Sequence, residues 1–208
     1  RGHIQSLYKI KKIQDYCTCE NFEVSVRKKI KRCNININNL EKRIINAINS
    51  NAYEKLKTIN FSNRKNYLFV GTGGSYAGAK FSAKIINNLY GSNTITLLPR
   101  NVYYRNNDSV DNVFLFTYSG TTNDLLVGTS LLGNDKKFII TKGEIQKVVT
   151  KTNISKKNII SYRTNTNKGK ERGFLSFEGA LAPASLFLKL YFEKNADDDL
   201  ETFIKNSI

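Results

Sequence analysis

The sequence contains no methionine, no tryptophan, one histidine and only two prolines among its 208 residues. The lack of methionine is unusual and indicates either a piece of a longer protein or methionines missing from the sequence. The single histidine, His3, stands at the start of the sequence, so no interior histidine is available for proton transfer or metal binding. The three cysteines, Cys17, Cys19 and Cys33, lack a fourth zinc ligand, and free thiols are expected. We therefore predict neither a metal nor a cofactor.

Long apolar runs are also missing. None approaches the ~20 residues that a membrane-spanning helix needs, and residues 1–6 do not resemble a signal peptide. A hydrophobic content of 40% nevertheless suffices for a core in a chain of this length. The expectation is a cytoplasmic globular domain without membrane contact.

Acidic residues are few: 17 stand against 33 basic ones, which gives a net charge of +16 and a pI near 9.7. Such a balance attracts polyanions, so nucleic acid is a candidate partner. The basic residues are spread along the chain rather than gathered in an arm, and we read most of them as a solvated surface. Nucleic-acid binding therefore ranks below the proposals that follow.

The most informative stretch is residues 66–78, NYLFVGTGGSYAG. A strand-forming apolar run passes through three glycines into helical sequence, and this pattern predicts a strand, a tight turn and a helix start. Glycine amides and a helix N-terminus together favour anions, most often phosphate. The stretch matches neither the P-loop nor the dinucleotide motif, so a turn needed only for tight packing remains the alternative.

A second polar turn follows another apolar strand, residues 113–118. Four hydroxyl residues crowd it: Thr117, Ser119, Thr121 and Thr122. One of them would be enough to cap the next helix, and capping alone is the alternative reading. If the two strands are neighbours in a parallel sheet, both turns line one crevice at their carboxyl ends, where open α/β sheets bind ligands.

Taken together, the two turns resemble the sugar isomerase (SIS) domain family. Its first motif is matched by residues 73–77 (GGSYA), and its Ser-x-Ser-Gly-x-Thr-x-Asp motif by residues 117–124 (TYSGTTND), with Thr117 where serine is usual. The resemblance implies a phosphosugar-binding domain, often dimeric. It also implies the residues that hold the phosphate or sugar: Gly73, Gly74, Ser75, Thr117, Ser119, Gly120, Thr121 and Thr122.

The order of elements agrees with this resemblance. Residues 37–56 have the periodicity of an amphipathic helix, and strands are expected at residues 67–70, 94–98, 113–118, 137–141 and 158–162, with helices between them. Pro99 is expected to close the second strand, and the helix after the third strand is expected to run through Leu132. We predict an α/β fold, a three-layer αβα sandwich with a five-stranded parallel sheet of flavodoxin-like order. Residues 1–35 are assigned to a basic N-terminal extension that packs on a partner subunit, and residues 36–208 to a single SIS domain.

An aldose-ketose isomerase needs a base that moves a proton between two carbons, and in the SIS family a glutamate serves. Glu171 and Glu178 are the acids expected near the end of the fold that carries the two turns. Glu171 is preferred because its loop follows the fifth strand. Glu171 also has a plain alternative role, as a counter-charge for Lys170 and Arg172. Two functions thus remain open: a sugar-phosphate isomerase of carbohydrate metabolism, with its site completed across a homodimer, and a non-catalytic phosphosugar sensor.

Overall fold

The computed structural model describes residues 39–104, 108–164, 177–195 and 200–207. The chain divides into two units, and every helix and strand given below belongs to the second, which comprises residues 40–170 and 176–208. The predicted extension of residues 1–35, the three cysteines and Glu171 lie outside the described residues.

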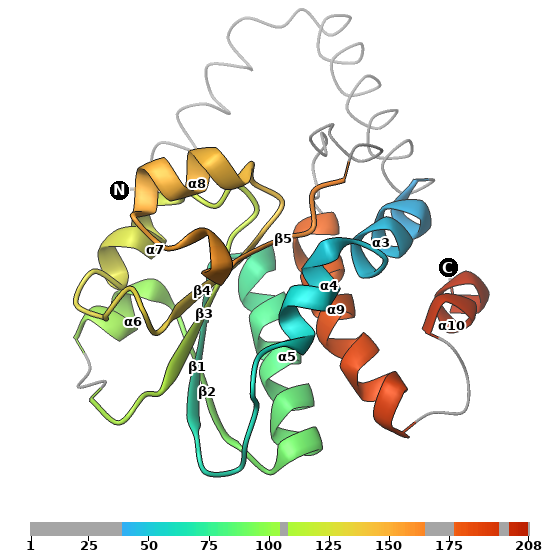
Figure 1. Ribbon diagram of the computed structural model, residues 1–208, viewed down its shortest axis with the longest axis horizontal. Helices are drawn as coiled ribbons and strands as arrows, with labels where there is room; N and C mark the ends of the chain where they lie inside the picture. Colours follow the sequence, from blue (N-terminus) through green and yellow to red (C-terminus); the bar gives the residue numbers. More distant parts are fainter. Residues whose placement is uncertain (1–38, 105–107, 165–176, 196–199, 208) are drawn as a thin grey trace, which may run out of the picture. The chain divides into compact units, whose positions relative to one another are not determined.

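A five-stranded parallel sheet forms the centre of this unit (Figure 1). Strands β1 and β3 are aromatic and aliphatic runs buried on both sides, as expected where helices cover both faces of a sheet. The predicted parallel sheet and its flavodoxin-like order are confirmed. The strands are β1 (Asn66–Gly71), β2 (Asn93–Leu97), β3 (Asn112–Phe116), β4 (Lys137–Thr141) and β5 (Ile159–Ser161), in the order β2-β1-β3-β4-β5.

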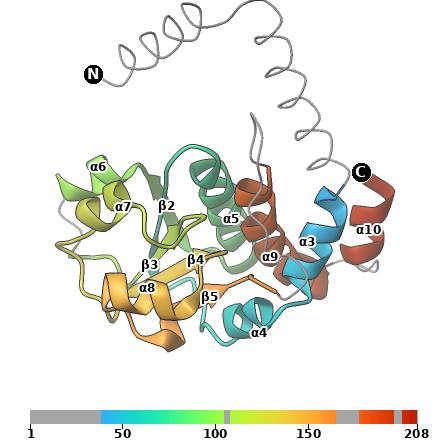
Figure 2. The ribbon, with the colours of Figure 1, turned by 90° about the horizontal axis from the view of Figure 1, so that it is seen from above.

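Helices cover both faces of the sheet, which confirms the three layers (Figure 2). One face carries α4 (Asn51–Lys57), α5 (Gly74–Tyr90) and α9 (Glu178–Asn195). The other carries α6 (Pro99–Tyr103), α7 (Asn123–Gly128) and α8 (Ile145–Thr152). Helices α3 (Leu40–Ile48) and α10 (Leu200–Ser207) pack with α9, and a single 3-10 turn, Lys156–Asn158, precedes β5.

The two faces of the sheet are filled by different kinds of side chain. Because side chains alternate along a strand, Phe69 of β1 lies on the α5 and α9 side, whereas Val70 lies on the α6 to α8 side. The first core is rich in aromatic rings: the ring centroid of Phe69 is 5.0 Å from that of Phe114 and 5.9 Å from that of Phe187 on α9. The second core is entirely aliphatic. It supports the helices that follow β2, β3 and β4.

The predicted continuous helix over residues 37–56 is wrong, because its described part consists of two helices. Ser50 separates α3 from α4. Its hydroxyl donates a hydrogen bond to the Ala47 carbonyl (2.6 Å) and accepts one from the Ala52 amide (3.3 Å). One serine thus ends the first helix and caps the second, which periodicity alone does not reveal.

Two further differences concern helices. Pro99 was expected only to end the second strand, but it begins α6. Proline is tolerated at this first helical position because the N–H that it lacks would have no partner within the helix. The helix expected to run through Leu132 ends at Gly128, and a Cβ atom at Gly128 would collide with the Pro99 carbonyl, so α6 and α7 pack closely there.

Within the part of the chain that the structure describes, no helix has the length and apolarity needed to cross a membrane.

Candidate functional site

The two polar turns lie side by side at one edge of the sheet. Strands β1 and β3 are paired neighbours, with Gly71 opposite Phe116. The chain leaves them at Thr72 and Thr117, and the helices that follow, α5 and α7, lie on opposite faces of the sheet (Figure 2). This is the topological switch point at which open α/β sheets form a crevice. Below, the first turn is residues 71–75 and the second turn is residues 117–122.

Glycine backbone builds the first turn. Gly73 precedes α5 with a φ of 58°, which residues with a side chain rarely adopt. A Cβ atom on Gly71 would lie 2.6 Å from the Ser75 carbonyl oxygen, so α5 begins directly against the end of β1. Gly73 and Gly74 are exposed, and no described side chain caps α5. The amides at the start of this long helix are therefore accessible hydrogen-bond donors.

Hydroxyl groups organise the second turn. The Oγ1 atoms of Thr117 and Thr122 are 2.7 Å apart, and Thr122 Oγ1 is 3.5 Å from Ser119 Oγ. Thr117 Oγ1 also accepts a hydrogen bond from the Gly120 amide (3.3 Å), and Ser119 Oγ accepts one from the Thr121 amide (3.2 Å). Thr122 is the N-cap residue of α7, but its side chain makes no capping bond. Capping therefore does not account for these hydroxyls.

Neighbouring elements fix the second turn further. Gly120 has a φ of 78°, and a Cβ atom there would collide with the side chain of Val148 on α8. The Tyr118 carbonyl accepts hydrogen bonds from the Lys142 amide (3.2 Å) and from Thr141 Oγ1 (3.1 Å). The shape of the turn is thus set by packing and by hydrogen bonds from the end of β4.

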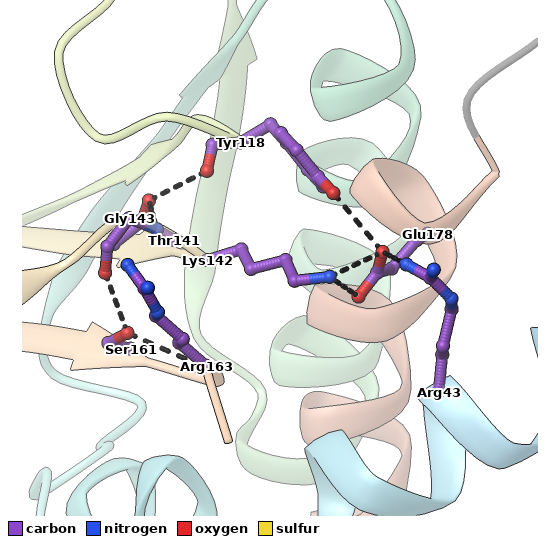
Figure 3. Close-up of polar contacts among 8 residues, drawn as sticks. All are labelled: Arg43, Tyr118, Thr141, Lys142, Gly143, Ser161, Arg163 and Glu178. Atoms are coloured by element: carbon purple, nitrogen blue, oxygen red, sulfur yellow. Dashed lines mark hydrogen bonds and ion pairs between the residues drawn. The ribbon is translucent and has the colours of Figure 1, made fainter. Parts of the chain in front are cut away.

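A buried carboxylate, Glu178, lies at the start of α9 and connects the second turn to α3 and to the residue that follows β4 (Figure 3). Lys142 Nζ is 2.6 and 2.8 Å from its two oxygens, and Arg43 Nη1 of α3 is 2.7 Å from Oε2. The Tyr118 hydroxyl donates to the same Oε2 at 3.2 Å. The side chain of Glu178 is fully buried and that of Lys142 is 5% exposed. A buried carboxylate is stable only with such partners.

The structure thus gathers all eight residues predicted to bind phosphate or sugar into two adjacent turns. Ser119 is exposed, and Ser75, Thr121 and Thr122 are partly buried. Thr117 and Gly120 are buried, so they support the turn rather than face solvent. The candidate base Glu171 lies outside the described residues. Among those that are described, no group of three or more His, Cys, Asp or Glu side chains has an arrangement that would hold a metal ion.

Sequence reasoning missed most of the cluster around Glu178. From the sequence, Glu178 is only the second acid near this edge, Tyr118 is only a variable position of the second motif, and Arg43 and Lys142 have no predicted role. Arg43 lies in α3 and Glu178 in α9, while Tyr118 and Lys142 follow the ends of β3 and β4, and the four positions have no common spacing. Only the tertiary fold brings them together.

Neither a family model nor a curated protein matches the chain. Several solved structures do. The C-terminal domain of glucosamine-fructose-6-phosphate aminotransferase from Francisella tularensis matches with a TM-score of 0.56 and 18% identity, over 84% of this chain and 52% of that one. Glucosamine-6-phosphate deaminase from Thermotoga maritima matches with a TM-score of 0.56 and 20% identity, over 86% of this chain and 51% of that one. The chain therefore spans about half the length of these two structures.

A third match is similar in length to this chain. It is a candidate phosphosugar isomerase involved in capsule formation from Bacteroides fragilis, with a TM-score of 0.50 and 15% identity, over 83% of this chain and 95% of that one. At such identities, the likeness concerns the fold.

Proposed function

We propose that this chain, which has the fold of sugar isomerase (SIS) domains, binds a phosphorylated sugar where its first and second turns meet. The observation that supports this most is the pairing of β1 with β3, which brings a glycine turn and a hydroxyl-rich turn to the same edge. A phosphate ester needs several hydrogen-bond donors that converge from different directions. Here the accessible amides of α5 come from one side and the hydroxyls of Ser119 and Thr122 from the other.

Charge supports an anionic ligand. The chain has a net charge of +16, which raises the local concentration of anions by long-range attraction. Among the described residues, the cluster beside the second turn joins two cations, Lys142 and Arg43, to the carboxylate of Glu178. These cations lie on the side of the second turn and support an anionic ligand there.

We further propose isomerase activity, which needs a base that moves a proton between two carbons of the sugar. Glu171 is our candidate. Glu178, the other acid considered, is a poor one: its carboxylate is fully buried and bonded to Lys142 and Arg43, and it must lose such bonds before it can accept a proton from substrate. This observation favours a second candidate function, a non-catalytic phosphosugar sensor that uses the same two turns.

The binding proposal is tested by measuring thermal shifts with hexose, hexosamine, pentose and heptose phosphates beside their unphosphorylated parents. We expect a shift only with phosphorylated compounds. Replacing Ser119 with Ala and Thr122 with Val together should weaken binding more than about tenfold, since a hydrogen bond to a charged group contributes roughly 1.5–3 kcal/mol. Ser130→Ala with Thr150→Val, two exposed hydroxyls elsewhere, is the matched control. If the site variant binds as tightly as the wild type, this site is wrong.

Catalysis is tested on whichever compound binds, by following its aldose and ketose forms by NMR. Interconversion that disappears in Glu171→Gln, with binding retained, supports the isomerase. Binding without interconversion in the wild type supports the sensor.

A further inference from the structure

A cavity of about 620 Å³ opens next to the proposed phosphate site, between α6 and α7. These two helices lie side by side in both views (Figures 1 and 2). Its volume lies within the range of roughly 300–1,000 Å³ that is typical of pockets for drug-sized ligands. Its main lining residues are Thr72, Pro99, Tyr103, Tyr104, Asp124 and Val127.

The cavity borders the first turn and begins one residue after the second. Thr72 belongs to the first turn, between Gly71 and Gly73. Asn123, another lining residue, directly follows Thr122 of the second turn. A ligand whose phosphate is held by the two turns can therefore extend into the cavity without leaving the protein surface.

The lining is mostly apolar and aromatic. Among the described residues, three of the eight large apolar side chains that are exposed line this one cavity: Tyr103, Tyr104 and Val127. Tyr104 is 86% exposed, and its ring is 5.3 Å from that of Tyr103 at an interplanar angle of 84°. Exposed apolar side chains that gather in a hollow are typical of ligand sites, and tyrosine faces stack well on flat rings.

A sugar ring is a poor fit for such a lining, because each of its hydroxyls needs a hydrogen-bond partner. A flat heterocycle fits better, since its faces can stack on the tyrosines while its polar edge reaches side chains such as Asn123 and Arg100. We propose that this cavity binds an aromatic base carried by the phosphorylated ligand, so that the ligand class is a nucleoside phosphate. This inference rests on the proposed phosphate site, and it agrees with the sensor rather than with the isomerase, because the anomeric carbon of a nucleoside carries the base and cannot interconvert between aldose and ketose forms.

The test compares three compounds that differ by one part each: adenosine 5′-monophosphate, ribose 5-phosphate, which lacks the base, and adenosine, which lacks the phosphate. Affinities are measured by calorimetry on the full chain. We expect the monophosphate to bind at least about tenfold more tightly than ribose 5-phosphate, as stacking of one base on an aromatic side chain allows. Adenosine alone should bind more weakly than the monophosphate.

A substitution that fills the cavity tests whether the base binds there. Val127→Trp should remove the gain that the base gives and leave the affinity for ribose 5-phosphate unchanged. Leu131→Trp is the control, because Leu131 is 73% exposed and does not line the cavity. It should leave all three affinities unchanged.

The remaining outcomes separate the two proposals. Equal affinities for the monophosphate and ribose 5-phosphate, both lost on replacing Ser119 and Thr122, overturn the base pocket and leave the phosphate site standing. No binding of these or any other sugar phosphate overturns both. If Val127→Trp converts a wild-type dimer to monomer in light scattering while the affinities stay unchanged, the cavity belongs to a subunit interface and the inference falls.

Discussion

The first and second turns each contain a glycine with a positive φ, Gly73 at 58° and Gly120 at 78°, yet their surroundings differ. A Cβ atom on Gly73 would meet nothing within 4 Å, whereas one on Gly120 would collide with Val148. The second turn is held by side chains of α8, of β4 and of the residues after β3. The first turn is formed mainly by glycine backbone at the start of α5. The second turn is therefore preorganised for a ligand, whereas the first has room to adjust to it at Gly73.

A large loss of stability is expected when the carboxylate that anchors the second turn is removed. Glu178→Ala removes the counter-charge of Lys142 and Arg43, and breaking a buried ion pair costs about 3–5 kcal/mol. For a domain of this size the loss corresponds to a drop in Tm of about 6–20 °C. Calorimetry or circular dichroism measures it.

Glu144→Ala is the control for that variant. Glu144 is exposed and pairs with Lys147 at the surface, at 3.1 Å, so its loss should cost less than about 1 kcal/mol. Equal, small drops in Tm for both variants would show that the second turn does not depend on Glu178.

The two glycines give the most direct test of the comparison. Gly73→Ala costs only backbone strain, about 1–3 kcal/mol for a residue held in a sparsely populated region. Gly120→Ala costs similar strain plus about 1–3 kcal/mol for the collision with Val148. We expect the Tm of Gly120→Ala to be the lower of the two. We also expect only Gly120→Ala to regain stability when Val148 is shortened to Ala in the same chain.

A result in which Gly73→Ala is the more destabilised variant would reverse the comparison. It would mean that the first turn is the rigid one. The affinities of the same two variants for a sugar phosphate should then be compared. The variant in the rigid turn should lose more affinity, because ligand binding does not restore the shape of a rigid turn.

Local patterns predicted the sheet well because its strands are compact apolar runs that end in glycine or hydroxyl residues. β4, residues 137–141, was predicted with its observed bounds, and the pairing of β1 with β3 followed from the family resemblance. Breaks within helices were harder to predict. Ser50 interrupts a stripe of apolar residues that continues on both sides, and nothing in the spacing of that stripe marks the break.

The residues of the site likewise divide into those that could be recognised from the sequence and those that could not. The hydroxyls of the second turn are consecutive in sequence, so they could be recognised together. Arg43 and Glu178 are separated by 135 residues, and their contact depends on how α3 packs with α9. The cavity between α6 and α7 was missed for a similar reason, since α6 itself was not predicted.

The smallest expected effect lies at the other end of α9, where Glu193 provides an exposed counterpart to Glu178. Its Oε2 is 3.0 Å from Lys57 Nζ, and the two side chains are 38% and 53% exposed. Burial alone would raise the pKa of Glu193, but the hydrogen bond and charge of Lys57 lower it below its usual value. A carboxyl with a lowered pKa in the folded state stabilises the protein above its unfolded pKa, about 4.3, and this contribution is lost as pH falls through the folded pKa. Glu193→Gln should therefore lower the Tm slightly at pH 7, and the difference should vanish in acid. Because solvent screens this pair, a drop at pH 7 as large as that of Glu178→Ala would contradict the distinction between buried and exposed acids on which the large effect expected for Glu178→Ala depends.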